Sequence, residues 1–411
     1  MEKDSRLLSI IKEGTEDTFA VWKEELKNVF RDGGVVIFFF LVPLCYPLLY
    51  AFIYDNEIVR EAKLAVVDQS ATYLSREFIR RIDATPDVQV IGVYTDLEEA
   101  RRRMDQKDAY GILLFPSEFS REVHTGRQTR LSLYCDMSSL LYYKAFLLSA
   151  TEVSLDIGKE FMKRNEPAAF TEASQEILVN PVHYEQVMMF NTQGGFASFL
   201  VPAILILIIH QTLLLGICML GGTAGEKRRL RDPSPPLSFR PYSGTLRIVL
   251  GKSLAYLLLY TVVCLWVLAV VPRLFSLPQA GDPGDVLLFI LPYLSACIFF
   301  AMTLSGFMTS RESPFLLLVF TSVILLFLSG ISWPVEAMPP FWRALSYVFP
   351  STPGIQGFVR IHTMGASLSE VAFEYRLLWI QAGVYFILAC LNYRYRLIHY
   401  RPDAFPSSAQ R

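Results

Sequence analysis

Long runs of apolar residues constrain this chain more than any other feature of its sequence. A helix needs about 20 such residues to cross the hydrocarbon of a bilayer, because lipid offers no hydrogen-bond partner to an open backbone. Six segments of the 411-residue chain meet or approach this length. They lie at residues 34–54, 196–220, 249–271, 285–308, 313–331 and 377–393. The sequence therefore predicts a membrane protein, mainly α-helical, with six transmembrane helices.

The composition agrees with a membrane protein and excludes a nucleic-acid binder. Hydrophobic residues make up 52% of the chain and charged residues 19%, against about 45–50% and 25% in an ordinary soluble domain. The 38 Lys and Arg residues nearly balance the 39 Asp and Glu residues, so no overall positive charge would attract nucleic acid. The six cysteines form no CxxC pair, so neither a disulfide framework nor a zinc knuckle is expected.

Lys and Arg residues in the segments between the spans predict the orientation. Short cytoplasmic segments carry an excess of these residues, whereas long translocated domains largely escape the rule. Seventeen lie on one side of the membrane and three on the other. The richer side comprises residues 1–33, 221–248, 309–312 and 394–411, and the poorer side comprises 272–284 and 332–375. Both termini are therefore expected in the cytoplasm, with residues 55–195 outside.

The segment 55–195 has 141 residues, enough for a domain with its own core. Short apolar strands alternate in it with helical segments. The strands are expected at 63–67, 88–93, 110–115 and 130–135, and the helices at 71–82, 97–106, 117–125 and 140–165. The sequence thus predicts an extracytoplasmic α/β domain between the first and second spans.

An amphipathic pattern covers residues 15–32, directly before the first span. Its apolar residues recur at spacings of three and four: Phe19, Trp22, Leu26, Val29 and Phe30. Gly33 and Gly34 end the pattern. Such a helix lies in the membrane plane with Trp22 among the headgroups. It either carries motion from a soluble partner to the first span or is a passive interfacial anchor, and the sequence leaves both open.

The predicted cytoplasmic loop 221–248 combines a charged cluster with a proline run. The cluster consists of Glu226, Lys227, Arg228, Arg229 and Arg231. The prolines at 233, 235 and 236 stop any helix. Topology alone requires a basic loop here. The functional alternative is a short helix that docks on a cytoplasmic protein, with one acid beside four bases.

The sequence offers no enzymatic or nucleotide-binding motif. Gly251-Lys252-Ser253 resembles the end of a phosphate-binding loop, but Leu246 stands where that loop needs a glycine. The tripeptide opens a predicted span, so Lys252 is expected to snorkel to the interface. The five histidines are scattered, and Ser332 lacks the second glycine of a nucleophile elbow. No metal and no cofactor are therefore expected in this chain.

His210 and Gln211 lie near the middle of the second span, where a polar side chain must face protein or water. They either line a substrate route or form hydrogen bonds to a neighbouring helix, which is common in helix bundles.

The segment 332–376 is apolar but too broken by proline to span the membrane. Pro334, Pro339, Trp342 and Pro350 mark its turns and its aromatic side. Short helices are expected between Pro340 and Pro350 and from Gly354 to Ile361. The segment is either a re-entrant or interfacial hairpin that closes the outer end of a translocation path, or an aromatic belt that anchors the bundle.

The whole arrangement resembles a permease of the ABC exporter type 2 family, in the subgroup with a large external domain after the first span. VVDQSATYLSREFIRRI and EEARRRMDQKDAYGILLFPSEFSREVHTGRQTRLSLYCD resemble parts of that domain. GEKRRLRD resembles the loop that docks on the ATPase, and SGISWPVEAMPPFWRALSYVFPSTPGIQGFVRI resembles the loop between the last two spans. The resemblance covers residues 15 to 400 and is specific as a set.

The resemblance implies partners and roles for particular residues. Two permease subunits, as a homodimer or heterodimer, would enclose a path built by their second and fifth spans, and two cytoplasmic ATPases would bind ATP and Mg. Residues 15–32 would be the connecting helix, and Glu226 would anchor the coupling helix. Lys227, Arg228, Arg229 and Trp22 would join this contact. The family's usual Gly-Thr after the charged cluster is replaced here by Leu230-Arg231, and the proline run stiffens the loop.

Candidate path residues share one helical face on each of the two spans. They are Phe199, Ile206 and His210 on the second span and Phe320, Phe327 and Ile331 on the fifth. A lipid-facing stripe would show the same pattern.

The expected function is that of a permease in the bacterial inner membrane, moving a hydrophobic or amphipathic small molecule outward with energy from a separate ATPase. The resemblance also implies that the external domain either receives released cargo or docks a periplasmic membrane-fusion adaptor. The alternative is a sensor or scaffold whose external domain binds a ligand or an envelope partner. A membrane-embedded enzyme would need polar pairs at one depth, and the sequence offers only His210 with Gln211.

Overall fold

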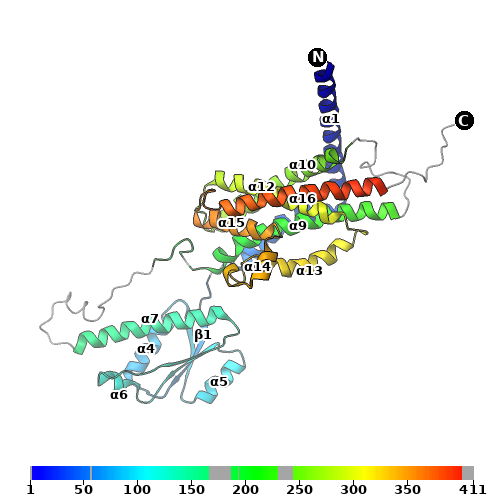
Figure 1. Cartoon of the computed structure of the whole chain (residues 1–411). Helices are drawn as coiled ribbons and strands as arrows, with labels where there is room; N and C mark the ends of the chain where they lie inside the picture. The colour runs from blue at the N-terminus through cyan, green and yellow to red at the C-terminus, as the bar shows by residue number, and fades with distance from the viewer. Residues whose placement is uncertain (1, 56–57, 166–186, 193, 230–243, 400–411) are drawn as a thin grey trace. The chain divides into compact units, whose positions relative to one another are not determined.

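The computed structural model describes residues 2–55, 58–165, 187–192, 194–229 and 244–399, without the side chains of 2–11, 162–165, 227–229 and 397–399. The chain divides into two compact units (Figure 1). The bundle unit comprises Met1–Asp55 and Met189–Arg411, and the α/β domain comprises Asn56–Met188. In the sequence, the α/β domain therefore lies between the two segments that form the bundle unit.

The helices of the bundle unit follow the predicted apolar runs. They are α1 (Glu2–Arg31), α2 (Gly33–Val36), the π-helical η1 (Ile37–Leu41), α3 (Val42–Ile53), α9 (Phe196–Arg229), α10 (Thr245–Cys264), the π-helical η3 (Leu265–Val270), α11 (Val271–Leu274), α12 (Pro283–Ser305), α13 (Ser313–Leu328), the 3₁₀ turn η4 (Val335–Ala337), α14 (Pro340–Ser346), α15 (Ser351–Met364) and α16 (Ala372–His399). Figure 1 shows α9, α10, α12 and α16 running side by side.

Among the described residues, five helical segments are long and apolar enough to cross a membrane. They are Gly33–Ile53, Phe196–Glu226, Thr245–Leu274, Pro283–Ser305 and Ala372–Arg396. The fifth predicted span, 313–331, has a helix of only 16 residues, Ser313–Leu328. At 1.5 Å per residue this helix is about 24 Å long, shorter than the hydrocarbon core of about 30 Å. Gly330, with a φ of 89°, turns the chain just after the helix.

Predicted span boundaries differ from the helices at several ends, and the sixth span, expected at 377–393, lies within the longer α16, Ala372–His399. The second span was expected to end at 220, but α9 continues through Arg229 into the predicted loop. The third span was expected to start at 249, but α10 starts at Thr245. Polar residues at the end of a helix remain good helix formers, so hydropathy marks the edge of the apolar run and not the end of the helix.

The central helix of the bundle is α9, which contacts α3, α12, α13 and α15. Most of its apolar stretch is buried inside the protein. Gly216 allows the ring of Phe39 from η1 to pack against it, because a Cβ at Gly216 would lie 1.9 Å from a carbon of that ring. The helix is apolar all round, as expected of a helix enclosed by other helices.

The α/β domain contains a four-stranded sheet in the order β2-β1-β3-β4. The strands are β1 (Ala62–Asp68), β2 (Val88–Tyr94), β3 (Gly111–Phe115) and β4 (Ser132–Cys135). β1 pairs in parallel with β2 and β3, and β3 pairs antiparallel with β4. The helices are α4 (Tyr73–Asp83), α5 (Leu97–Asp105), α6 (Phe119–His124) and α7 (Leu140–Asn165). All eight elements match the predicted strands and helices in order and type.

Two hydrophobic layers flank this sheet, because successive residues of a strand point to opposite faces. Leu64 and Val66 of β1 pack with α4 and α7, where Phe146 is fully buried. Ala65 and Val67 pack on the other face with α5. Both faces are covered, as expected for parallel strands.

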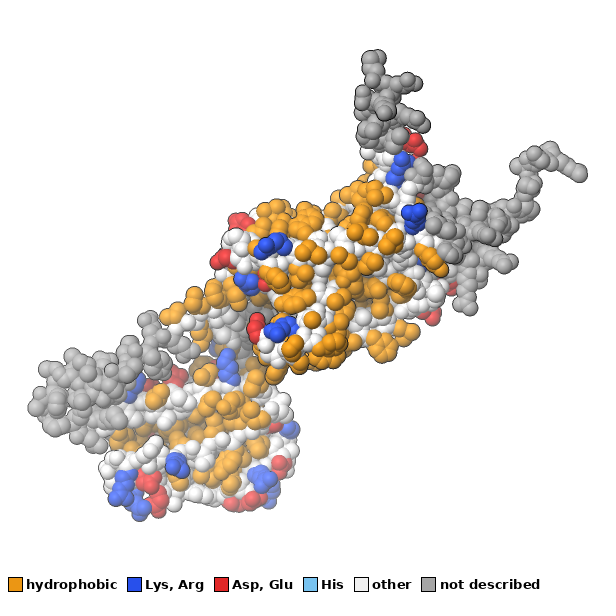
Figure 2. Space-filling view, in the orientation of Figure 1, with side chains coloured by type: hydrophobic (Ala, Val, Ile, Leu, Met, Phe, Trp, Pro, Cys, Tyr) orange, Lys and Arg blue, Asp and Glu red, His pale blue; other side chains and the backbone are white. Residues whose placement is uncertain are grey.

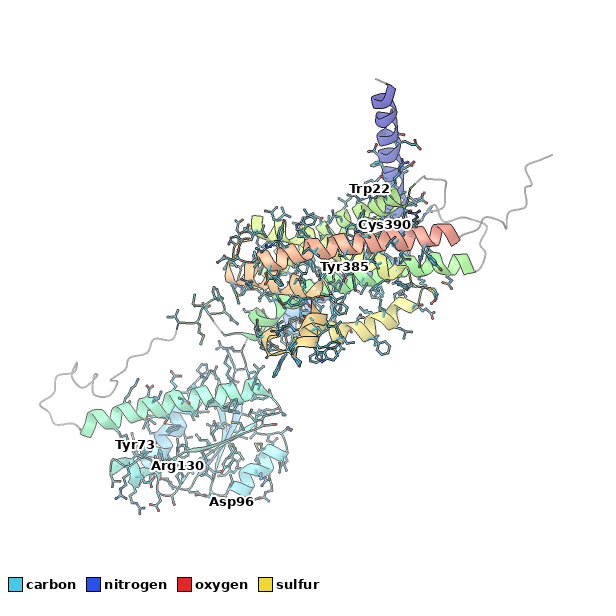
Figure 3. The ribbon with its side chains drawn as sticks, in the orientation of Figure 1. Trp22, Tyr73, Asp96, Arg130, Tyr385 and Cys390 are labelled. Atoms are coloured by element: carbon cyan, nitrogen blue, oxygen red, sulfur yellow. The ribbon has the colours of Figure 1, made fainter. Side chains whose placement is uncertain are left out.

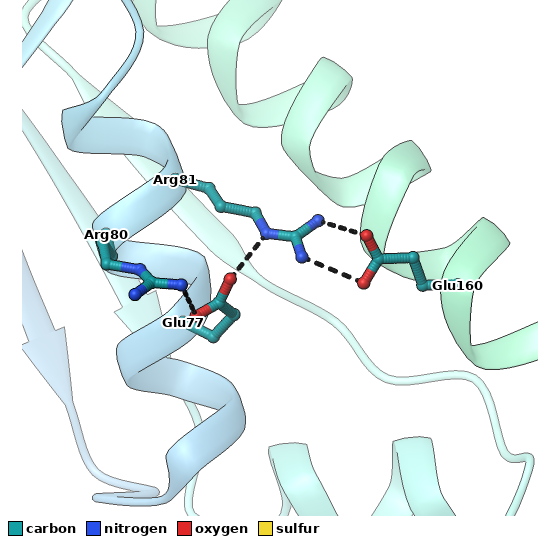
Figure 4. A network of polar contacts seen from close by, with 4 residues as sticks. All are labelled: Glu77, Arg80, Arg81 and Glu160. Carbon is teal, nitrogen blue, oxygen red and sulfur yellow. Dashed lines mark hydrogen bonds and ion pairs between the residues drawn. The ribbon is translucent and has the colours of Figure 1, made fainter. Parts of the chain in front are cut away.

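A charged network ties α4 to α7 on the outside of the domain (Figure 4). The guanidinium of Arg81 donates to both carboxylate oxygens of Glu160, each at 2.9 Å, and to Glu77 at 2.9 Å. Hydrogen bonds from Arg81 and then Arg80 lower the pKa of the Glu77 carboxyl below its usual range. The bidentate geometry fixes the angle at which the two helices meet.

We predict that Phe146→Ala lowers the free energy of unfolding of the α/β domain by about 3–5 kcal/mol, because it leaves a cavity against β3. Leu148→Ala is the matched control on the same helix, since Leu148 is half exposed. It should change stability by about 0.5 kcal/mol or less. Hydrogen exchange of the β1 and β3 amides in the full chain measures both, and equal protection in the two variants would contradict the assignment of the core.

Candidate functional site

The α1 helix packs against α10 through a face that carries one buried acid. Val21, Glu25 and Val29 are buried, each about one turn apart. Gly251 of α10 allows the close approach, because a Cβ there would lie 2.7 Å from the carbonyl oxygen of Thr18. Gly251 of the Gly-Lys-Ser tripeptide therefore serves helix packing.

Glu25 forms an ion pair with Lys252 inside this contact. The Lys252 Nζ lies 2.9 Å from Glu25 Oε2, and both side chains are largely buried. The hydroxyl of Tyr256 donates to Glu25 Oε1. The prediction that Lys252 snorkels to the interface is wrong, because α10 begins before it and the α1 helix supplies a carboxylate at its side.

Two further ion pairs fasten α1 to the same end of the bundle. Arg247 of α10 donates to Asp17 at 2.6 Å. Asp32, which caps α2 by accepting from the Gly34 and Val35 amides, also accepts from Arg311 at 2.5 Å. Arg311 lies between α12 and α13. We call these seven residues the α1 clamp: Asp17, Glu25, Asp32, Arg247, Lys252, Tyr256 and Arg311.

The C-terminal end of α9 packs against residues 305–311, at and after the end of α12, through three glycines. A Cβ at Gly221 would lie 2.8 Å from the carbonyl oxygen of Ser305, one at Gly222 2.2 Å from that of Ser310, and one at Gly225 2.8 Å from that of Met308. We call this contact the glycine seam. The glycine seam places residues 305–311 directly against α9. Arg311, at the end of this segment, belongs to the α1 clamp. Contacts therefore connect α9 to α1 through residues 305–311.

The predicted coupling residues lie at this end of α9. Glu226 is an exposed residue of the helix, one position after the last seam glycine. The helix includes Lys227, Arg228 and Arg229, whose side chains lie outside the described part, as do residues 230–243 with the proline run. Which of these residues contact an ATPase therefore stays a prediction.

Trp22 is half buried on α1, where that helix runs beside α10 (Figure 3). Its ring stacks on Phe19, with centroids 5.1 Å apart. Of the predicted apolar residues, Phe19 and Phe30 are mostly exposed, whereas Val29 is fully buried and Leu26 packs against the bundle core, so the pattern covers both the bundle contact and the open side of α1. An exposed aromatic face is what an interfacial helix requires.

The predicted path residues of the second span occupy different environments. Phe199 is exposed, whereas Ile206 and His210 are fully buried within the bundle. The Ile206 carbonyl accepts from the Tyr293 hydroxyl at 2.7 Å. The His210 ring lies 5.7 Å from the ring of Phe300, and neither of its nitrogens has a hydrogen-bond partner among the described residues.

The predicted path residues of the fifth span lie on or near an open apolar face of α13. Phe320 and Phe327 are 69% and 57% exposed, and Ile331, just beyond the helix, is half buried. Leu316, Val319 and Val323 extend this exposed face. Figure 2 shows hydrophobic side chains across much of the visible bundle surface. The structure does not gather the six predicted path residues around one cavity of the single chain.

The predicted gate segment folds into the two short helices expected. Pro334 and Pro339 are exposed before α14, Trp342 is exposed on α14, and Pro350 is buried before α15. The α15 helix lies inside the bundle, where Gly354 packs against the ring of Tyr293 and Gly357 against that of Phe289. Gln381 donates to the Tyr347 carbonyl at 2.6 Å, which ties the segment to α16. The α15 part of the segment is thus enclosed by protein, whereas the turns around Pro334 and Pro339 are exposed.

Among the described residues, no group of three or more His, Cys, Asp or Glu side chains is placed to hold a metal ion.

The α1 clamp is the part of the site that the sequence analysis missed. Its pairs join residues more than 200 positions apart, so no local pattern contains them. One signal was present: Glu25 lies between Val21 and Val29 at helical spacing, and an acid on an apolar helix face needs a partner.

The chain was compared with known proteins. Residues 34–391 match the sequence profile of the family described as "ABC-2 family transporter protein". The "Probable multidrug ABC transporter permease YbhR" of Escherichia coli K12 is 21% identical over 354 residues, covering 85% of this chain and 90% of that protein. The "Linearmycin resistance permease protein LnrN" of Bacillus subtilis 168 is 21% identical over 357 residues, covering 81% and 88%.

We predict that Lys252→Met lowers the free energy of unfolding by about 3–5 kcal/mol, because it leaves the Glu25 carboxylate buried without its cation. Glu25→Leu combined with Lys252→Met should recover most of this loss. Lys23→Met is the matched control, since Lys23 is exposed on α1. Thermal unfolding of the purified protein in detergent measures all three. Equal stability of the Lys252→Met and Lys23→Met variants would refute the role of the pair.

Proposed function

Because the chain belongs to the ABC-2 family of transporter proteins, we propose that it is the permease subunit of an ATP-driven exporter. Its curated relatives are named as multidrug and linearmycin-resistance permeases. Those names support a hydrophobic or amphipathic small molecule as the cargo and outward movement as the direction. ATP and Mg would be bound and ATP hydrolysed in a partner subunit.

The observation that carries this proposal is the link between the α1 clamp and the glycine seam. A permease powered by another subunit needs a surface that receives force and a rigid route into its helices. Glu226 lies beside the last glycine of the seam, and Arg311 joins the seam to Asp32 at the start of the first span. Ion pairs then join α1 to α10.

In this mechanism the ATPase docks at the end of α9, around Glu226, and against α1. Closure of the ATPase pair displaces both elements together, because backbone contacts and ion pairs connect them. The displacement biases the bundle between inward and outward arrangements, and ATP binding thereby changes the exposure of the path. This end of the bundle, with both termini, faces the cytoplasm of the bacterial cell.

A second permease subunit would cover the open face of α13. The residues on that face are apolar and largely exposed in the single chain, and Phe199 of α9 is exposed as well. A path between two copies would explain why the six predicted path residues share no cavity within one copy. The α14–α15 segment would then close the outer end of this path, and the α/β domain would lie outside and receive cargo or bind an adaptor.

We predict that Glu226→Ala reduces cargo-stimulated ATP hydrolysis about tenfold when the permease is reconstituted with its ATPase, because the charged docking contact is lost. Glu336→Ala is the matched control, an exposed acid in the loop after α13. Cargo uptake into vesicles is measured in the same preparation. Uncoupled uptake and hydrolysis in the native protein would favour a sensor, and unchanged hydrolysis in Glu226→Ala would reject Glu226 as the coupling residue.

We predict that a membrane-impermeant maleimide on intact cells modifies Cys135 and the cysteine introduced by Tyr73→Cys, but not the cysteine introduced by Arg229→Cys in a chain that also carries Cys135→Ser. Tyr73 is 79% exposed on the α/β domain, whereas Cys135 is half buried and burial raises the pKa of its thiol. The thiolate is the reactive form, so Cys135 should react more slowly than Tyr73→Cys and faster as the pH rises. The reverse labelling pattern would invert the proposed topology.

A further inference from the structure

An apolar cavity lies between α10 and α12. Its volume is about 560 Å³. Its walls are the leucines and other apolar residues of α10, η3 and α12, and the loop 279–283 and the end of α15 complete it. This volume falls within the range of about 300–1,000 Å³ that is typical of small-molecule sites.

The loop that completes this cavity is firmly held. The amides of Ala280 and Gly281 donate to the His362 carbonyl at 3.0 and 3.2 Å. Gly281 is required there, because a Cβ would lie 2.2 Å from the carbonyl oxygen of Ile361. The cavity wall formed by the loop and α15 is therefore preformed and does not depend on a bound molecule.

His362 lines the cavity with two unused polar atoms. Its side chain is 5% exposed, and its ring stacks on Phe358 with centroids 4.9 Å apart. Neither ring nitrogen has a hydrogen-bond partner among the described residues. A buried polar group without a partner is costly, and such a group beside a cavity indicates a ligand that supplies the missing hydrogen bond.

Three other polar side chains line the cavity, and one of them, Thr261, already donates to the Leu257 carbonyl of its own helix. Arg273 is in α11, which leads into the loop, and Gln279 is in the loop itself. Arg273 is the one charged residue among the described residues that line the cavity. A cation and two hydrogen-bonding side chains beside a long apolar wall suit a molecule with one anionic group and one hydrocarbon chain.

We propose that the cavity between α10 and α12 binds a single-chain amphiphile with an anionic head, which Arg273, Gln279 and His362 hold while the chain lies along the leucines of the two helices. The site is separate from the proposed path at α13, so it does not rest on the proposed transport function. A free fatty acid and a single-chain anionic phospholipid share the required chemistry.

The test uses the full-length protein in nanodiscs of phosphatidylcholine. A photoreactive oleate analogue and the matched oleyl alcohol analogue are crosslinked to it, and mass spectrometry locates the adducts. We expect oleate adducts on peptides covering residues 257–294, with about tenfold less labelling by the alcohol, as expected for loss of a charge-assisted contact. Unlabelled oleate or lysophosphatidylglycerol should compete, and whichever competes better identifies the source of the ligand.

Variants separate this site from general contact with lipid. Ala269→Trp fills the cavity from a half-buried lining position and should reduce labelling about tenfold, whereas Val262→Trp, on the exposed side of α10, should not. Arg273→Gln should remove the preference for oleate over the alcohol. His362→Phe should weaken labelling by both probes yet raise the melting temperature of the ligand-free protein, because it removes the unpaired nitrogens.

Three results would overturn the proposal: adducts that neither competitor displaces, equal labelling of the Ala269→Trp and Val262→Trp variants, or equal labelling by the two probes. Hydrolysis and uptake measured on Glu226→Ala test the transport function separately. Labelling of the cavity is read without ATP, so failure of one proposal leaves the other intact.

Discussion

The buried ion pair between Glu25 and Lys252 is the interaction on which the arrangement of the bundle unit depends. Taking two charges out of water is expensive, and the pair persists only because the partners meet directly and Tyr256 adds a hydrogen bond. Its geometry requires α1 to lie against α10, which Gly251 permits. Once α1 is fixed, Asp32 lies where it caps the first span and reaches Arg311. A single desolvated contact thus determines how the first element joins the bundle.

The two units obey different constraints. In the α/β domain, strand alternation separates two hydrophobic layers, and the charged network of Arg81 lies on the outside. In the bundle unit, apolar side chains face both the interior and the surface, and glycines determine where helices come closest. Polar groups therefore carry specificity there, at the α1 clamp and around His362. A role in coupling is proposed for the α1 clamp, and a ligand site is proposed around His362.

Local periodicity in the sequence predicted the secondary structure elements. The strands and helices of the α/β domain were all found in order, because each buries one face and alternation reveals it. The helices of the gate segment were found from prolines and aromatic spacing. Hydropathy did not predict the end of α9 or the start of α10, because each helix extends beyond its apolar run. The partner of Lys252 was missed because Glu25 is distant in the sequence, and no single-sequence pattern joins them.

The glycine seam and the exposed face of α13 differ in their tolerance to substitution. A side chain at Gly222 would have to displace a backbone carbonyl 2.2 Å away, and no rotamer of a neighbour relieves that collision. On α13, Leu316, Val319 and Phe320 are 65–69% exposed in the single chain, so exchange among apolar side chains there costs little of its stability. In the proposed transporter, substitutions that alter the path would therefore fall on α13 and not on the glycine seam.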